Sequence, residues 1–296
     1  MTKYFLFSIF TIFGLASCDN ILERNPIRTK DIYIEKYKDF IKAISDEDLL
    51  KIERIFREKN IDLNYSDSVY GVSFLNWCIF NKRVKSFQKL LELGADPNWQ
   101  DSNCKFAPSI TEAAKVDYTS KFLELSLING GNANLLSKRM SGSEDQSPLF
   151  GAIFSRRMES LILLTNKNVD VNLTQDSLWT PLAETLIHNK IEMTKYLIDH
   201  GADYNNLKFK TKTIALDKNK QPILNSDGSP IMKYDGELNI LDFLRNIQFP
   251  LNSKEYLIKM EIINFLKLKG LDYFNYPIPD EIKNQHKHDT AYLSKY

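Results

Sequence analysis

Apolar residues recur at the spacing of an α-helix in several short segments of the chain. The clearest segment is MTKYLI at residues 193–198, whose apolar positions follow the 3.6-residue period of an amphipathic helix. Gly201 follows this segment, and glycine commonly ends a helix. Asp203 and Asn205 come next and favour a turn. The pattern predicts a short amphipathic helix that runs into a tight turn.

The same pattern returns at nearly regular intervals. YLIDHGADYN at residues 196–205 closely matches KLLELGADPN at residues 89–98. The asparagines that close the copies are separated by 34, 36, 38, 33 and 70 residues, and they are Asn64, Asn98, Asn134, Asn172, Asn205 and Asn275. A second landmark, Thr180-Pro181-Leu182 or Ser147-Pro148-Leu149, begins 25 residues before its closing asparagine. The two landmarks together define a repeated unit.

Each repeat carries the signals of two helices. A serine or threonine can cap the first helix, and a proline fits the first helical position because its missing N–H costs nothing there. One pair of short helices cannot bury its own apolar face, so neighbouring pairs must stack. The sequence therefore predicts an all-α repeat solenoid.

This pattern resembles the ankyrin repeat, which opens with Thr-Pro-Leu-His and closes with Gly-Ala-Asp-x-Asn. The resemblance covers roughly residues 31–278 and implies an ankyrin-repeat stack of about six helix-pair units. Histidine is missing from the fourth place of every opening, where Asn76, Thr111 and Ala183 stand in three of the repeats. We therefore expect other contacts to fix the first helices.

The repeats are interrupted at about residues 206–238. Within this insert, Ile-Leu at 223–224 and Ile-Met-Lys-Tyr at 231–234 flank a turn that contains Asp227 and Gly228. These signals predict a β-hairpin inserted into the solenoid, and a flexible loop is the alternative. Residues 279–296 are assigned to a C-terminal tail, either a short helix or a loose segment.

An apolar leader precedes the repeats. Lys3 is followed by 12 mostly apolar residues at positions 4–15, a run too short to span a bilayer and typical of a signal peptide. Leu-Ala-Ser-Cys resembles the bacterial lipobox, which predicts a lipoprotein signal peptide at 1–17, lipidation of Cys18 and a flexible tether at 18–30. An ordinary secretory signal with an incidental cysteine and a buried apolar segment are the alternatives.

The lipobox resemblance also predicts the location of the chain. We expect a lipid-anchored protein of the bacterial cell envelope that faces the periplasm or the cell exterior. Asp19 follows the cysteine directly, and acidic residues there accompany retention at the inner membrane in some bacteria and surface display in others. Both locations of the lipid anchor, the inner membrane and the cell surface, therefore remain alternatives.

Composition and motifs argue against several functions. Lys and Arg number 39 against 38 Asp and Glu, so no bulk charge attracts nucleic acid or anionic lipid. The sequence contains no Gly-x-Ser-x-Gly, no phosphate-binding loop and no His-Glu-x-x-His. His286 and His288 have no third ligand nearby, so we predict no metal, no cofactor and no catalytic residue. Cys78 is expected to be a packed thiol, with a disulfide to Cys104 as the alternative.

In ankyrin-like stacks the first helix shows its variable residues on the concave face. In this register the resemblance implies the following partner-binding residues: Trp77, Phe80, Asn81, Glu112, Lys115, Phe154, Glu184, Ile187, His188 and Phe243. The apolar members form a stripe, and aromatic residues are favoured interface anchors. Irregular packing that turns some of them into core is the alternative. Further candidates in the loops and the insert are Tyr65, Tyr70, Trp99, Asp227 and Tyr234.

Two functions fit a lipid-anchored stack of this kind. Bacterial ankyrin lipoproteins resemble immunity proteins, which neutralise secreted antibacterial effectors, and an anchor raises the effective concentration against a membrane-directed toxin. The second function is an envelope stress-protection or assembly factor for an endogenous periplasmic enzyme such as a catalase. Both interpretations predict a monomer whose partner is another protein, with a membrane contact through the N-terminal lipid.

Overall fold

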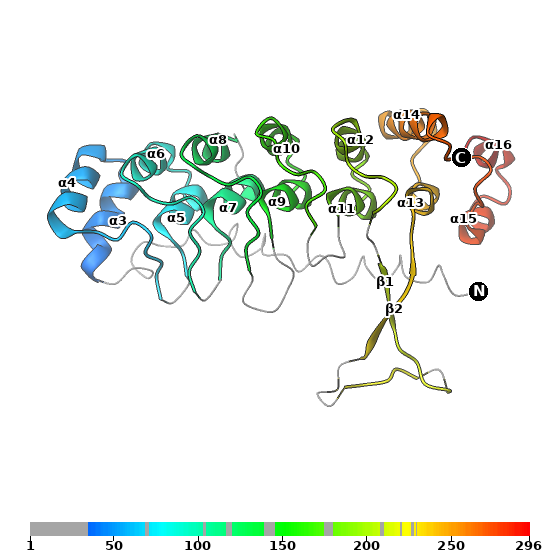
Figure 1. Cartoon of the computed structure of the whole chain (residues 1–296), viewed down its shortest axis with the longest axis horizontal. Helices are drawn as coiled ribbons and strands as arrows, with labels where there is room; N and C mark the ends of the chain where they lie inside the picture. The colour runs from blue at the N-terminus through cyan, green and yellow to red at the C-terminus, as the bar shows by residue number, and fades with distance from the viewer. Residues whose placement is uncertain are drawn as a thin grey trace. The chain divides into compact units, whose positions relative to one another are not determined.

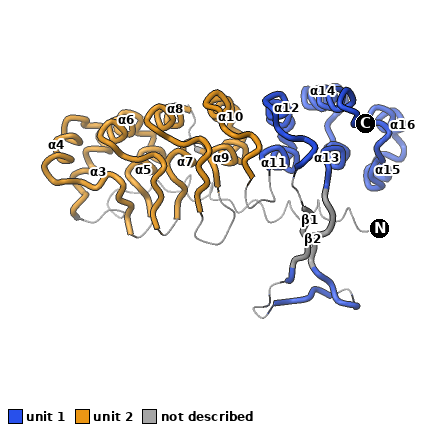
Figure 2. Tube along the Cα trace, viewed as in Figure 1, with its two compact units in different colours: residues 1–16, 177–296 blue, residues 17–176 orange. Residues whose placement is uncertain are grey.

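The computed structural model describes residues 35–68, 71–102, 105–116, 120–138, 146–174, 180–207, 210–219, 221–225, 228 and 230–296. The predicted signal peptide, Cys18 and the tether lie outside the described residues, and so do Tyr70, Cys104 and Asp227. The chain divides into two compact units (Figure 2). We call the one that ends at Asp176 the first unit (orange, unit 2 in the figure) and the one that begins at Ser177 the second unit (blue, unit 1 in the figure).

Both units are built from pairs of short helices (Figure 1). After a 3-10 turn η1 (Glu35–Tyr37), the first unit holds α3 (Lys38–Ser45) with α4 (Leu49–Lys59), α5 (Phe74–Phe80) with α6 (Val84–Glu92), α7 (Ser109–Val116) with α8 (Lys121–Ile128), and α9 (Pro148–Phe154) with α10 (Met158–Thr165). The second unit holds α11 (Pro181–Ile187) with α12 (Ile191–Asp199), α13 (Ile240–Asn246) with α14 (Lys254–Leu268), and the short helices α15 (Asp280–Gln285) and α16 (Thr290–Lys295).

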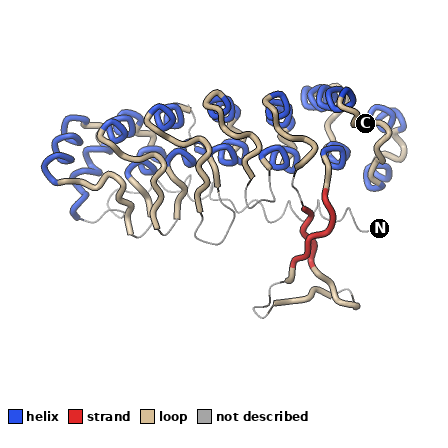
Figure 3. The backbone as a smooth tube through the Cα atoms, viewed as in Figure 1, coloured by secondary structure: helices blue, strands red, loops and turns tan. Residues whose placement is uncertain are grey.

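The helices of each unit form two layers (Figure 3). We call the first helix of each pair the inner helix and the second the outer helix. In the first unit the inner helices contact one another in succession, and so do the outer helices; the inner ones are α3, α5, α7 and α9, and the outer ones are α4, α6, α8 and α10. In the second unit α11 contacts α13, and α12 contacts α14. The core includes Phe40, Phe74 and Phe87, all completely buried. The predicted all-α repeat solenoid is confirmed.

The predicted helix caps are present. The hydroxyl oxygens of Ser73, Ser147 and Thr180 accept hydrogen bonds from the backbone N–H three residues later, at 3.1, 3.3 and 3.2 Å. Pro148 and Pro181 occupy the first helical position, as their fixed φ favours. At α13 the cap is Asn239, whose side chain is part of a capping box.

Other side chains replace the missing histidines of the openings. Asn76 stands in the fourth place of its opening, and its Nδ2 donates a 3.0 Å hydrogen bond to the Ala107 carbonyl oxygen of the following repeat. Thr180 donates from its hydroxyl to the Leu207 carbonyl oxygen at 2.8 Å. The inner helices α5 and α11 are thus tied to loops 31 and 27 residues further along the chain.

The closing asparagines link successive repeats. The Oδ1 atoms of Asn64, Asn98 and Asn134 accept hydrogen bonds from the backbone N–H of residues 96, 132 and 170, at 2.9, 2.7 and 2.8 Å. The residue that donates each bond also forms a turn of its own; Asp96 Oδ1, for example, accepts from Asn98 N at 2.8 Å. The regular spacing of these asparagines therefore reflects a ladder that runs from one repeat to the next.

The insert forms an antiparallel pair of strands, β1 (Lys210–Ile214) and β2 (Met232–Glu237). The predicted second strand at 231–234 falls largely within β2. Residues 223–224, predicted as the first strand, do not belong to β1, whose Ile214 pairs with Met232, but Leu224 makes an isolated antiparallel bridge to Pro230 across the predicted turn. Residues nearer the tip make only isolated bridges. The strands are hydrogen-bonded along 210–214, so this part of the insert is ordered backbone rather than a flexible loop.

Residues 279–296 form two short helices packed on the last repeat. Ile282, Tyr292 and Tyr296 make a small core together with Leu251, Ile278 and Leu293. Two buried cations lie beside them. Arg245 donates to the carbonyl oxygens of Tyr296 and Tyr273 at 2.6 and 2.5 Å. Lys259 donates to the Ile247 carbonyl oxygen at 2.8 Å, and its Nζ lies 4.3 Å from the Tyr296 ring centre.

We expect Asn98→Ala to destabilise the first unit by about 1–2 kcal/mol. Asn98 makes two bonds to the next repeat, because its Nδ2 also donates to the Gly130 carbonyl oxygen at 2.9 Å. Urea unfolding followed by circular dichroism would measure the loss. The matched control is Asn166→Ala at the end of α10, an exposed position, which should stay within about 0.5 kcal/mol of the wild type. Equal losses in both variants would contradict the ladder.

Stability should rise with pH above neutrality because of Lys259. Burial, reinforced by the charge of Arg245, lowers the pKa of Lys259 to about 7. Between this value and the pKa of the unfolded lysine, the unfolded chain holds a proton that the folded chain has released, so raising the pH favours folding by up to about 1.4 kcal/mol per pH unit. The free energy of unfolding in urea, measured between pH 7 and 8.5, would show the slope.

Two variants isolate the contribution of Lys259 to this slope. Lys259→Met should flatten the pH dependence, whereas Lys267→Met, an exposed lysine on the same helix, should leave it as in the wild type. A slope that survives Lys259→Met would assign the effect to other groups.

Candidate protein-interaction surface

The structure places several of the predicted concave residues in the core. Trp77 and Phe243 are 2% and 0% exposed, and Glu112 and Glu184 are buried as well. The inner helix α5 is contacted by α3, α6 and α7, so every residue from Phe74 to Ile79 is covered. The prediction that these four residues contact a partner was therefore wrong, and the alternative of core packing holds for them.

The accessible members of the predicted set lie at the C-terminal ends of the inner helices. Phe154, the last residue of α9, is 45% exposed. Phe80 ends α5 in the same way and is half-buried, with its ring centre 5.4 Å from that of Phe106. Asn81 follows Phe80 and is half-buried too, because its Nδ2 donates to the Trp77 carbonyl oxygen at 2.9 Å.

The second unit repeats this arrangement at the end of α11. Ile187 is half-buried and His188 is exposed. His188 Nε2 lies 3.1 Å from Glu184 Oε1, so the buried carboxylate has a partner within its own helix. In α5, α9 and α11 the accessible side chains are therefore at or just after the last turn of the helix.

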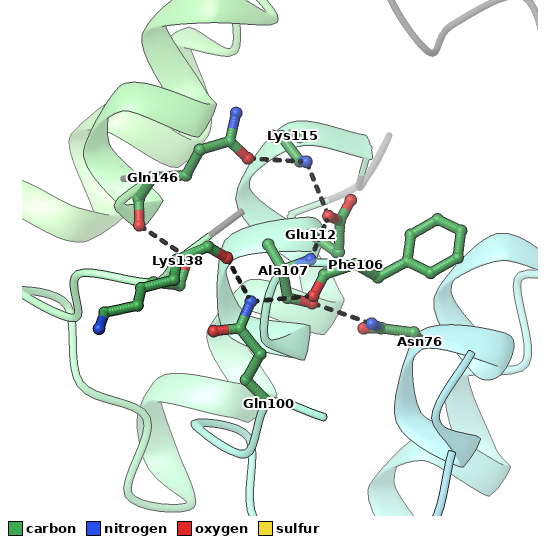
Figure 4. A network of polar contacts seen from close by, with 9 residues as sticks. Asn76, Gln100, Phe106, Ala107, Glu112, Lys115, Lys138 and Gln146 are labelled. Carbon is green, nitrogen blue, oxygen red and sulfur yellow. Dashed lines mark hydrogen bonds and ion pairs between the residues drawn. The ribbon is translucent and has the colours of Figure 1, made fainter. Parts of the chain in front are cut away.

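Glu112 belongs to a polar network between repeats of the first unit (Figure 4). Its Oε1 accepts hydrogen bonds from the Ala107 N–H at 3.2 Å and from Lys115 Nζ at 2.7 Å. Lys115 also reaches Gln146 Oε1 at 3.4 Å. The Glu112 side chain is 6% exposed, and its hydrogen bonds are made inside the stack. The Lys115 side chain is 14% exposed and takes part in the same hydrogen bonds.

Glutamine side chains extend the network to the neighbouring loops. Gln100 Nε2 donates to the carbonyl oxygens of Phe106 and Lys138 at 3.1 and 2.8 Å. Gln146 exchanges two 2.8 Å backbone hydrogen bonds with Ser137. A Cβ at Gly151 would lie 2.8 Å from Lys115 Cγ, so only glycine leaves room for this lysine. The network fixes loop positions, and it holds a paired acid and base rather than a reactive group.

The loop candidates also make internal contacts. Tyr65 is half-buried, with its ring centre 4.3 Å from that of Tyr37, and burial raises its pKa. Trp99 is half-buried at the base of its loop. Tyr234 belongs to β2. Tyr70 and Asp227 lie outside the described residues, so the interface prediction is untested for them.

The described residues offer little reactive chemistry. Cys78 is a free, fully buried thiol, and burial raises its pKa well above the ordinary value. No cluster of three or more His, Cys, Asp or Glu side chains that could hold a metal ion occurs in the described ranges. None of the helices described here combines the length and the apolar character that a membrane crossing requires.

Sequence reasoning missed one apolar group in the insert. Leu216, Ile223, Leu224 and Ile231 are all exposed. Their positions could have been noticed, because 216 and 224, and also 223 and 231, are eight residues apart. The hairpin prediction assigned Ile223-Leu224 to a strand but did not predict that these side chains are exposed.

Comparison with known proteins agrees with the repeat pattern. Residues 110–208 match the family of ankyrin repeats (3 copies). Among solved structures, an ankyrin repeat domain from Acinetobacter baumannii AYE is similar at 23% identity, with 63% of this chain and 87% of that chain covered and a TM-score of 0.48. The ankyrin repeat domain of Bcl-3, a member of the IkappaB protein family, is similar at 18% identity, covering 57% and 73%, with a TM-score of 0.48. No curated protein matches the chain.

The family match covers three of the helix-pair regions, and the described geometry carries the same caps and closing asparagines beyond it. Ankyrin repeats bind other proteins and generally act as non-catalytic scaffolds. Residues 110–208 are therefore similar to the family of ankyrin repeats, and the repeat pattern of the described residues extends beyond that match.

Proposed function

We propose that this chain is a lipid-anchored ankyrin-repeat protein of the bacterial envelope that binds and neutralises a secreted antibacterial effector. The observation that carries the binding role is the exposure of Phe154. It is 45% exposed at the end of a helix whose other six residues, Pro148 to Ile153, are all buried. An exposed aromatic side chain on a rigid helix is a typical interface anchor.

The proposed anchor follows from the leader. The apolar segment at 4–15 and the Leu-Ala-Ser-Cys pattern support export and lipidation at Cys18. More than one acyl chain is needed for stable attachment, and lipoprotein modification supplies several. A neutraliser held at the membrane meets a membrane-directed toxin at a high effective concentration, which raises its apparent affinity without any new contact.

Phe154→Ala should weaken partner binding about tenfold or more while leaving the helix content unchanged, because truncating an aromatic anchor typically costs over 1 kcal/mol. The probe is the protein that co-purifies with the detergent-extracted chain, identified by mass spectrometry and then titrated calorimetrically. Ile162→Ala is the matched control, since Ile162 is 38% exposed on the outer helix of the same repeat. Equal affinities for the wild type and Phe154→Ala would contradict the assigned surface.

The identity of that partner separates the immunity role from other envelope functions. If it is a secreted effector, co-expression of this chain should rescue cells from it, and Phe154→Ala should rescue them less well. A housekeeping envelope enzyme as the co-purifying protein would instead support the stress-protection or assembly role and would refute immunity.

Cys18→Ser should move the protein from the membrane pellet to the soluble fraction, because the lipid attachment site is lost. Fractionation and immunoblotting of cells that express the full chain measure this. Cys104→Ser is the control and should stay with the membrane. Membrane retention of Cys18→Ser would show that something other than this cysteine holds the protein.

A further inference from the structure

Residues 215–238 of the insert consist of three successive eight-residue segments. They are ALDKNKQP at 215–222, ILNSDGSP at 223–230 and IMKYDGEL at 231–238. Each begins with a small or branched aliphatic residue followed by leucine or methionine, and the first two end in proline. The tip therefore has an internal repeat of its own, unrelated to the helix pairs.

The first residues of the three segments meet in a closed ring of backbone hydrogen bonds. Ala215 N donates to Ile231 O at 2.8 Å, Ile231 N donates to Ile223 O at 2.7 Å, and Ile223 N donates to Ala215 O at 2.8 Å. Each residue gives one bond and receives one, so the ring leaves none of these six groups unpaired. Three chain segments are fixed at one point.

Three arms extend from this ring. One arm closes at the Leu216–Pro222 bridge and the second at the Leu224–Pro230 bridge. The third is the β1–β2 ribbon, which begins at the Ile214–Met232 pair. Figure 1 shows the two lobes at the end of the ribbon. We call residues 215–231 the lobed tip.

The lobed tip exposes aliphatic side chains, because its extended backbone forms one layer with no second layer of described residues packed on it. Leu216 and Leu224 are 52% and 55% exposed, and Ile223 and Ile231 are 40% and 37% exposed. Adjacent residues of extended chain point to opposite faces, so Ile223 and Leu224 lie on different sides of the layer. A two-stranded ribbon is marginal in water without a covering element. Both faces of the lobed tip therefore favour a partner that covers them.

The end of the first lobe is polar. Asp217 holds the first lobe through its Oδ1, which accepts from Asn219 N at 2.8 Å and from Gln221 N at 2.9 Å. Lys218 beside it is exposed and has the opposite charge. An apolar centre with a polar rim of both signs is the usual composition of a protein–protein interface. A bilayer fits less well, since the charged lobe ends would have to enter hydrocarbon before the leucines could.

We infer that the lobed tip is a docking element that inserts into an apolar cleft of the partner protein. This inference rests on the proposed protein-binding function. The insert occupies the loop between α12 and α13, so it continues the row of loops of a scaffold whose family binds proteins. A cleft covers both apolar faces at once, and polar groups on its walls can pair with Asp217 and Lys218 at the end of the first lobe.

Site-specific photo-crosslinking in cells tests the contact directly. A photoreactive phenylalanine analogue is placed at position 216 or 224 of the full chain, and at position 268 as control, because Leu268 is 87% exposed on α14 of the same unit. We expect positions 216 and 224 to capture the same protein that co-purifies with the wild type, through apolar residues that line a cleft. Position 268 should capture none of it.

Two variants measure the contribution to affinity. Leu216→Asp combined with Leu224→Asp should weaken binding of that protein at least tenfold. Replacing 215–231 by Asn-Gly should do the same and keeps the ribbon, because Ile214 and Met232 already face each other and Asn-Gly closes a two-residue hairpin. Unchanged helix content, measured by circular dichroism, shows that the repeats remain folded.

The outcomes separate this inference from the proposed function. If the wild type captures a partner that both variants still bind with wild-type affinity, the docking inference fails and the binding role stands. If the wild type captures no partner, both fail. Dimerisation in sedimentation experiments, or binding to phosphatidylethanolamine–phosphatidylglycerol vesicles, that disappears on removal of the lobed tip would also overturn the inference, because the tip would then serve a second copy or a bilayer.

Discussion

The hydrogen bond from a closing asparagine to the backbone of the next repeat is the contact on which the stack depends. Asn64, Asn98 and Asn134 each use one carboxamide oxygen in this way. The bond joins residues 32 to 36 positions apart, so it fixes one loop relative to the next while the helices bury their apolar faces against each other. A repeat lacking this bond would still have its helices but would lose the register of its loop.

This dependence explains why the fold could be predicted from the sequence. The residues that close the turns also join the repeats, so the asparagine at position 98 marks both a turn and a contact. The caps at Ser147 and Thr180 lie within three residues of the atoms they bind and follow from local chemistry. The lobed tip was not predicted, because its ring joins three residues whose pairing the alternation of apolar positions does not specify.

The candidate site was predicted less well for a physical reason. Exposure depends on how closely adjacent repeats approach, and a sequence position does not specify that distance. Glu112 was assigned to the surface, yet it is buried and paired with Lys115 of its own helix, and this lysine packs against Gly151 of the neighbouring helix α9. Likewise, the buried cations Arg245 and Lys259 depend on Tyr296, which is 51 residues from Arg245. Contacts at such separations become visible only in the folded chain.

The length of the inner helices decides where a partner can reach the protein. Helices α5, α9 and α11 have seven residues each, about two turns, and neighbours cover all but the last of them. The side chains left for recognition are therefore those at helix ends, such as Phe154, and those in the connections. An insert of some thirty residues in one connection adds a further group of exposed apolar side chains, which are Leu216, Ile223, Leu224 and Ile231. The proposed binding of a partner would thus use the loops more than the interior of the helical layer.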